Sequence, residues 1–259
     1  MSLVQLEIDD GVAVVRLDNP PLNLFTREMT RDLGEVLGAI ETDKRVRSVV
    51  ISATGVRAFS AGSDIKEFPD LIEQGTVIED KLALENATFD RLARLPIPTI
   101  GAILGVALGG GAELALCCDY RIMSETGRIG FPEIHLGTVP GSGGLARLPR
   151  LINPSMAIAL FIDGYPIDAR RALEIGFVNE VVEPSRCLES AIVRAREWAS
   201  RPAVAVRAIK QAVYGGTRDQ VTAELVSTLD VSRAIFATAD MLEGVSAFTE
   251  KRHPRFKHR

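Results

Sequence analysis

Hydrophobic and polar positions in the first part of the chain follow two different periods. Two apolar runs, 4–8 and 12–17, flank Asp9-Asp10-Gly11, a sequence typical of the tight turn between antiparallel strands. Apolar side chains then recur every three or four positions over 27–42, and Thr26 can cap the helix that this spacing predicts. The chain therefore begins with a predicted hairpin followed by an amphipathic helix.

The middle of the chain continues to alternate strands and helices. β-Branched and apolar runs predict buried strands at 47–52, 99–103 and 120–124, and a helix is expected to start near residue 110. The segment 66–85 is polar and irregular, so we expect a mobile loop that leads into a helix ending near residue 95. A second long irregular stretch, 127–144, is rich in glycine and proline.

Helical periodicity dominates the last hundred residues. Helices are expected at 154–163, 168–175 and 188–201, and from residue 202 onward the tail reads as entirely helical with short breaks. Strands that alternate with helices and end in a helical appendage predict an α/β fold. We expect a catalytic core over 1–200 and a helical C-terminal region over 201–259.

Composition excludes several classes of protein. The 259 residues are 46% hydrophobic and 25% charged, as in ordinary globular proteins, and a net charge of −4 argues against nucleic acid as a partner. The longest apolar stretch, 97–118, is broken by glycines, so no membrane span is expected. The amino terminus shows no signal-peptide pattern, and three cysteines without framework spacing indicate reduced thiols. These features favour a cytoplasmic location.

Two glycine-containing turns are the first candidates for chemistry. The turn within 58–67 consists of small residues, which let a ligand approach the backbone, although a plain strand-to-helix turn would also explain it. The segment 105–115 places three consecutive glycines at the start of an apolar helix, where unpaired N–H groups are exposed. Neither the dinucleotide fingerprint nor the Walker pattern fits this second turn.

Two glutamates lie close to these turns in the sequence. Glu113 is in the first turn of the apolar helix, where it is either a surface residue stabilised by the helix dipole or a buried functional group. Glu133 is in the stretch dense with glycine and proline, and loops of this kind commonly carry functional groups. A pair of carboxyls near N–H-rich turns suits acid–base chemistry on an activated carbonyl.

Three motifs give the chain a family resemblance. The segments 59–67, 105–113 and 132–144 resemble the signatures of the crotonase family in its order and spacing, and the similarity extends from about residue 17 to residue 252. The resemblance implies a crotonase-like spiral of ββα units with a C-terminal helical trimerisation region. It also implies an enzyme acting on coenzyme A thioesters, although one scaffold of this kind hosts many reactions.

The resemblance also implies roles for particular residues. The backbone N–H groups of Ser63 and Gly110 match the family's oxyanion hole, so the Ser63 side chain is expected to be dispensable. Glu113 and Glu133 match the two glutamates of the hydratases, whereas isomerases usually keep only the second, and Gly141 matches a position that helps to hold the water. This favours hydration of trans-2-enoyl-CoA to 3-hydroxyacyl-CoA, with no metal and no cofactor besides the coenzyme A of the substrate.

Further matches concern substrate binding. Positions that the resemblance places at coenzyme A are Ala61, Asp64, Ile65, Lys66 and Lys251. Phe68 and Phe131 are expected at the acyl pocket, and Phe131 stands where the family often has glutamine, so it would reshape that pocket. The acyl chain itself cannot be read from the sequence.

Other functions and the state of assembly stay open at this point. Isomerisation, hydration of a cyclic or aromatic-pathway acyl-CoA and thioester hydrolysis are alternatives within the family. A non-catalytic RNA-binding or scaffold member would need a basic helix, but 85–95 carries Arg91 and Arg94 against Glu85 and Asp90. The resemblance implies a homo-oligomer, either a trimer or a dimer of trimers, with the hexamer preferred.

Overall fold

Two sheets form the framework of the computed structural model, which describes residues 2–257. A six-stranded sheet has the order β1-β2-β3-β5-β7-β10, and a four-stranded sheet has the order β4-β6-β8-β9. The strands are β1 (Val4–Asp9), β2 (Val12–Leu17), β3 (Ser48–Ala53), β4 (Ala58–Ser60), β5 (Thr99–Ile103), β6 (Val106–Leu108), β7 (Tyr120–Ser124), β8 (Arg128–Gly130), β9 (Ile167–Asp168) and β10 (Glu180–Val182). From β3 to β8, successive strands alternate between the two sheets, and helices separate the strand pairs. This is the predicted spiral of ββα units.

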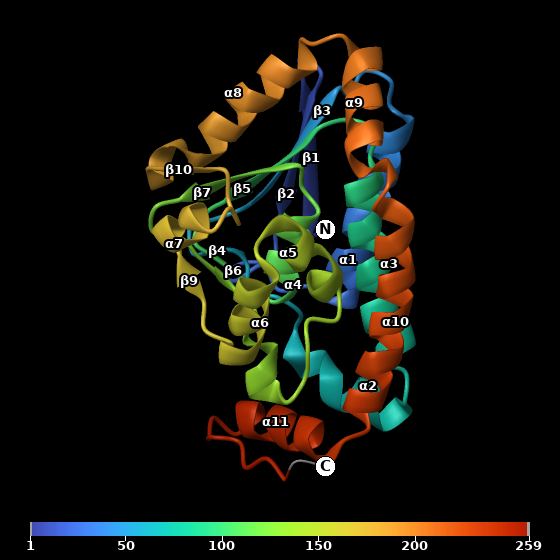
Figure 1. Cartoon of the computed structure of the whole chain (residues 1–259), viewed down its shortest axis with the longest axis vertical. Coiled ribbons are helices and arrows are strands. Elements are labelled where there is room, and N and C mark those ends of the chain that lie inside the picture. Colours follow the sequence, from blue (N-terminus) through green and yellow to red (C-terminus); the bar gives the residue numbers. More distant parts are fainter. Residues whose placement is uncertain (1, 258–259) are drawn as a thin grey trace.

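Helices occupy the connections and the tail from Ala203 to Thr249 (Figure 1). The α-helices are α1 (Arg27–Thr42), α2 (Phe68–Gln74), α3 (Ala83–Arg94), α4 (Gly110–Leu116), α5 (Gly144–Leu151), α6 (Pro154–Asp163), α7 (Ala169–Glu174), α8 (Cys187–Ala199), α9 (Ala203–Gly215), α10 (Arg218–Phe236) and α11 (Ala239–Thr249). Single turns of 3₁₀-helix are η1 (Ile65–Glu67), η3 (Pro132–Leu136) and η4 (Pro184–Arg186), and η2 (Ile78–Leu82) is a π-helical turn. The prediction that the tail is helical is confirmed from Ala203 to Thr249, whereas 250–257 form no helix.

The start of the chain folds as its sequence predicts. β1 and β2 pair antiparallel, and Asp10 and Gly11 between them have φ angles of 45° and 77°. Positive φ at both central residues is the geometry that asparagine, aspartate and glycine tolerate in a two-residue hairpin. The Thr26 hydroxyl accepts a hydrogen bond of 3.1 Å from the Met29 N–H at the start of α1, so the predicted cap is confirmed.

Both faces of the six-stranded sheet are buried by helices. On one face α8 packs its small residues Ala191, Ala195 and Ala199 against Val14 and Val50 of the sheet. The alternate strand residues point to the other face, which α1 covers with Met29, Leu33 and Leu37. Figure 1 shows α8 along the upper left of the molecule, and α9, α3 and α10 down its right side. Because successive side chains of a strand point to opposite faces and both faces are buried, the inner strands of this sheet are mainly apolar runs in the sequence.

The prediction of a mobile loop over 66–85 was wrong. This segment forms η1, α2 and η2 and runs directly into α3. Its apolar side chains, including Phe68, Leu71 and Leu82, pack in one cluster with Phe236 of α10 and Met241 of α11. Because the partner side chains lie more than a hundred residues further along the chain, the local sequence gave no sign of this burial. Within residues 2–257 no helix is both long and apolar enough to cross a membrane.

Candidate active site

Two backbone turns lie against each other at the centre of the site. They are the turn after β4, which contains Gly62 and Ser63, and the turn between β6 and α4, which contains Gly109 and Gly110. A methyl group added to Gly62 would lie 2.9 Å from the Leu108 carbonyl oxygen and 3.4 Å from the Gly110 nitrogen. Gly62 also has φ +94°, so the close approach and the backbone angle both require glycine here.

The N–H groups of Ser63 and Gly110 are both available to a ligand. Gly62 O and Asp64 N bond to Phe25, at 2.9 Å each, and since peptide groups alternate along an extended chain, the N–H of Ser63 points to the opposite side. Gly110 is the first residue of α4, whose initial N–H groups have no partner within the helix. Within residues 2–257 no acceptor takes a hydrogen bond from either N–H. The structure thus places the two N–H groups that the sequence analysis named on neighbouring turns.

Glu113 is held rigidly on the floor of the site. The side chain is buried, and its Oε1 accepts hydrogen bonds from the N–H groups of Ser142 at 2.8 Å and Gly144 at 2.7 Å. Burial raises the pKa of Glu113 to about 7, and the two N–H donors limit the rise because they favour the carboxylate. The group can therefore exist in both protonation states near neutral pH, as a general base requires.

Glu133 has a different environment in the same place. The residue is half-buried, but its Oε2 is enclosed and has no hydrogen-bond partner among the described residues. Burial raises the pKa of Glu133 well above its usual range, and the negative charge of Glu113 raises it further. A methyl group on Gly109 would lie 3.0 Å from Glu133 Oε1, so a side chain there would displace the carboxyl. Burial and the neighbouring carboxyl thus both favour the protonated form of Glu133.

One cavity of about 80 Å³ connects these groups. It brings together most of the residues that the sequence singled out, namely Ala61, Ser63, Ile65, Phe68, Gly110, Glu113, Glu133 and Gly141. Leu82 and Phe236 complete the apolar part of its wall, and the ring of Phe236 meets that of Phe68 edge to face at 5.6 Å between centroids. The tail therefore contributes to the site of its own chain.

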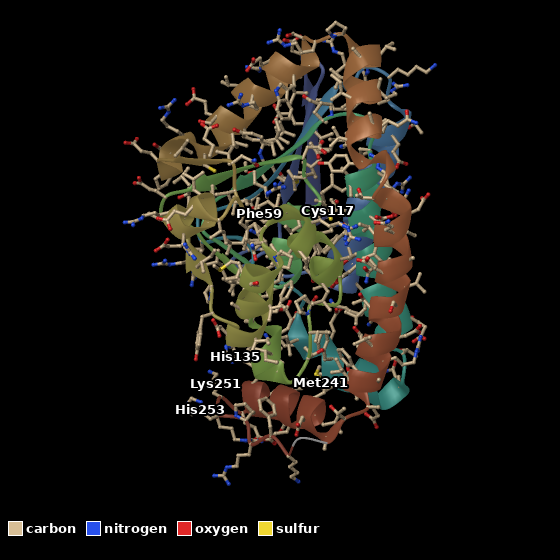
Figure 2. The ribbon with its side chains drawn as sticks, viewed as in Figure 1. Phe59, Cys117, His135, Met241, Lys251 and His253 are labelled. Atoms are coloured by element: carbon tan, nitrogen blue, oxygen red, sulfur yellow. The ribbon has the colours of Figure 1, made fainter. Side chains whose placement is uncertain are left out.

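Four of the predicted residues lie outside the cavity wall. The Asp64 carboxylate accepts a hydrogen bond from the Lys66 N–H and caps η1, while the Lys66 side chain is exposed. Lys251 is exposed at the end of α11, as Figure 2 shows at the lower edge of the molecule. Phe131 does not shape the acyl pocket as expected. Its ring is fully buried in the core, 5.0 Å from the Phe161 ring, and does not line the cavity.

The sequence analysis missed a third carboxylate, Glu85. It is 1% exposed and accepts hydrogen bonds from the hydroxyls of Ser63 at 2.8 Å and Ser142 at 2.7 Å. Lys81, one helical turn earlier, places its Nζ 3.5 Å from Glu85 Oε1. The spacing of Lys81 and Glu85 was a visible signal, but in a segment interpreted as a loop it suggested only surface charge.

A larger cavity of about 400 Å³ lies elsewhere, between α4 and α5 on one side and α9 and α10 on the other. Its wall includes Arg121, Arg147 and Arg218 but neither Glu113 nor Glu133. We assign the chemistry to the smaller cavity because it alone joins paired carboxyls of different pKa to free N–H donors. Among residues 2–257 no cluster of three or more His, Cys, Asp or Glu side chains could hold a metal ion.

Comparison with known proteins places this site in a family. Residues 7–259 match the family model described as enoyl-CoA hydratase/isomerase. The chain is 39% identical over 254 residues to the short-chain-enoyl-CoA hydratase of Clostridium acetobutylicum, covering 97% of this chain and 96% of that protein. It is 34% identical over 252 residues to the crotonyl-CoA hydratase of Syntrophomonas wolfei, covering 97% and 96%.

Solved structures agree with the sequence comparison. The carnitinyl-CoA hydratase of Mycobacterium avium has a TM-score of 0.90 at 30% identity, and the alignment covers 100% of both chains. An enoyl-CoA hydratase from Bacillus anthracis has a TM-score of 0.80 at 33% identity, again over 100% of both chains. The paired glutamates and the two N–H turns thus lie on a known scaffold, and the chain belongs to the enoyl-CoA hydratase/isomerase family.

Proposed function

We propose that this protein adds water to trans-2-enoyl-CoA thioesters and forms 3-hydroxyacyl-CoA. One observation carries the proposal: two carboxyls in different environments, Glu113 with two backbone N–H donors and Glu133 with an enclosed Oε2 that has no partner among the described residues, line one cavity beside two unused backbone N–H groups. Hydration needs a base for the water and an acid for the carbon, and the presence of both carboxyls favours it over isomerisation. The names of several relatives support the same reaction.

The mechanism follows from the state of each group. The thioester oxygen accepts hydrogen bonds from the N–H groups of Ser63 and Gly110, and each such donor typically stabilises the developing enolate by about 3–4 kcal/mol. Ionised Glu113 takes a proton from water as the oxygen attacks C3. Protonated Glu133 delivers its proton to C2, and Gly141 helps to hold the water. Two backbone N–H donors favour the ionised form of Glu113, while burial and the charge of Glu113 favour the protonated form of Glu133, and these environments suit the two roles.

Coenzyme A binds across the turn that starts at Ala61 in this proposal. Ala61 and Ile65 line the cavity, so the thioester arm would pass over them. Asp64 supports this turn by capping η1, and the exposed cation of Lys66 lies beside it, where a phosphate could reach it. Lys251 is assigned to a ligand phosphate as well, either in its own chain or in a neighbouring subunit.

The test is hydration of crotonyl-CoA by the purified protein. Loss of the absorbance of the conjugated thioester gives the rate, and mass spectrometry of the product shows the gain of one water. Glu113→Gln and Glu133→Gln should each lower kcat by about 10²-fold or more, because a well-placed acid or base contributes roughly that factor. KM should change little, since both residues act on the reacting atoms.

Isomerisation is measured with a 3-enoyl-CoA in parallel. A wild-type protein that moves the double bond of that substrate but leaves crotonyl-CoA unchanged would exclude the proposed hydratase. Near-normal hydration by folded Glu113→Gln would exclude the assigned base.

A further inference from the structure

We propose that Glu85 is a positioning residue that holds the oxyanion turn and the Glu113-binding loop in fixed register. It does so by accepting hydrogen bonds from Ser63 on one side and Ser142 on the other. The inference rests on the proposed function, because it concerns the geometry of the same site. Glu85 does not line the cavity, so it acts through these two serines and not on the substrate.

The first contact leads to the oxyanion turn. Ser63 Oγ donates to both carboxylate oxygens of Glu85, at 2.8 Å and 3.0 Å. The same residue carries one of the two free N–H donors, so fixing its side chain fixes the direction of that N–H. The expectation that the Ser63 hydroxyl is dispensable therefore needs revision.

The second contact leads to the loop that holds Glu113. Ser142 Oγ donates to Glu85 Oε2 at 2.7 Å, and the Ser142 N–H donates to Glu113 Oε1 at 2.8 Å. The neighbouring side chain on α3, Asn86, donates to the Gly141 carbonyl oxygen at 2.6 Å. Two adjacent residues of α3 therefore hold two adjacent residues of this loop.

The surroundings of Glu85 explain how a carboxylate is tolerated there. Lys81 is fully buried, and its Nζ faces Glu85 while it donates to Glu67 at 2.7 Å and to the Phe25 carbonyl oxygen. An ion pair that is enclosed and fully hydrogen-bonded is costly to assemble but demands one geometry. Because Phe25 also bonds to both neighbours of Ser63, the lysine supports the same turn.

The negative charge of Glu85 has a second effect, on the pKa values of the two cavity glutamates. Burial is the main cause of the raised pKa values of Glu113 and Glu133, and the negative charge of Glu85 raises both further. Among the described residues, the titratable groups that interact with Glu85 are Lys81 from η2 and the two cavity glutamates, and Lys81 is itself paired with Glu67 from η1. Removing the charge should thus lower the pH at which the base titrates.

The experiment compares three variants with a matched control. Glu85→Gln keeps the shape but loses the charge, and Ser142→Ala and Ser63→Ala each remove one contact. Ser48→Ala is the control, since it deletes an equally buried hydroxyl, bonded to Ala195 O at 2.9 Å, on the opposite side of the sheet. Each is assayed for kcat and KM with crotonyl-CoA and for its melting temperature.

We expect Ser142→Ala and Ser63→Ala to lower kcat by about tenfold, because small misplacements of catalytic groups cost that much or more. KM should stay within about twofold, and Ser48→Ala should keep its kcat. Glu85→Gln should shift the acid limb of the pH profile to lower pH. The double variant Glu85→Gln with Ser142→Ala should lose less than the product of the single losses, because both changes break the same contact.

The same kcat in all variants with only a lowered melting temperature would show a purely structural role and overturn the proposal. A second readout separates this from failure of the proposed function. A 3-ketoacyl-CoA forms an enolate whose absorbance reports stabilisation by the two N–H donors without turnover. If the wild type enolises this ligand but hydrates nothing, the hydratase proposal fails, while loss of the enolate signal in Ser63→Ala and Ser142→Ala still supports Glu85. Unchanged enolate in both variants contradicts it.

Discussion

The pH dependence of hydration follows directly from the environment of Glu113. An exposed glutamate would be ionised throughout the range above pH 5.5, but burial raises the pKa of Glu113 to about 7. If the ionised form is the base, the active fraction is about 9% at pH 6, about half at pH 7 and about 91% at pH 8. Between pH 7 and pH 6, kcat/KM should therefore fall about fivefold.

The assay is kcat/KM for crotonyl-CoA between pH 5.5 and 9 at constant ionic strength. This parameter reports the free enzyme, which is the state that the structure describes. The pKa of Glu133 is raised well above its usual range, so its deprotonation should give a decline only at pH values above the acid limb. Because the two carboxyls interact, the apparent pKa values of the two limbs of the pH profile describe the pair of carboxyls and not either residue alone.

A flat profile from pH 5.5 to pH 8 would refute this reasoning, since it would mean that Glu113 titrates as an exposed carboxyl does. Glu113→Gln is the control, and its residual activity should lose the acid limb. Melting temperatures across the same pH range show whether unfolding contributes to any fall in rate.

Three further outcomes are expected. Glu133→Gln should gain stability relative to the wild type as pH rises above about 4.5, because over that range only the unfolded wild-type chain ionises this carboxyl. The gain should be up to about 1.4 kcal/mol per pH unit until the pKa of the folded protein is reached. Equal melting temperatures of the two proteins at pH 8 would contradict a Glu133 that stays protonated in the folded protein. Phe236→Ala opens the cavity beside Phe68 and should raise kcat/KM for an eight-carbon relative to a four-carbon enoyl-CoA by about tenfold, whereas an unchanged ratio would place the acyl chain elsewhere. Light scattering should give a trimer or hexamer, because Val204 and Ile209 of α9 are 84% and 64% exposed in the single chain, and a fully active monomer would count against assembly as part of the site.

Local pattern was enough to predict those parts of the fold in which neighbouring residues decide the structure. The Asp10-Gly11 turn and the Thr26 cap depend on backbone angles and contacts within a few residues, and both appear as predicted. The segment 66–85 differs because its apolar side chains are buried by Phe236 and Met241, which no local period reveals. The sequence pattern identified helices with a clear apolar period, such as α1, but missed α2 and could not show which helices come together.

The same distinction applies to the site. Glu113 and Glu133 could be singled out because each lies next to a glycine turn and matches a family motif. Glu85 could not be singled out, because its role depends on the hydroxyls of Ser63, 22 residues earlier in the chain, and Ser142, 57 residues later. Phe131 was misplaced for a related reason, since its ring is buried against Phe161, thirty residues further along the chain, and local sequence does not show such a contact.

The contact between α11 and η3 limits how the tail could be exchanged in protein engineering. A methyl group on Gly244 of α11 would lie 2.2 Å from the Leu136 carbonyl oxygen, and one on Gly137 would lie 2.8 Å from the Asp240 carbonyl oxygen. Two backbones that touch without side chains between them accept almost no substitution at either glycine. A chimera that grafts the tail of a relative onto this core, which already carries Gly137, would therefore need a glycine at the position of Gly244, or the turn that carries Glu133 would move.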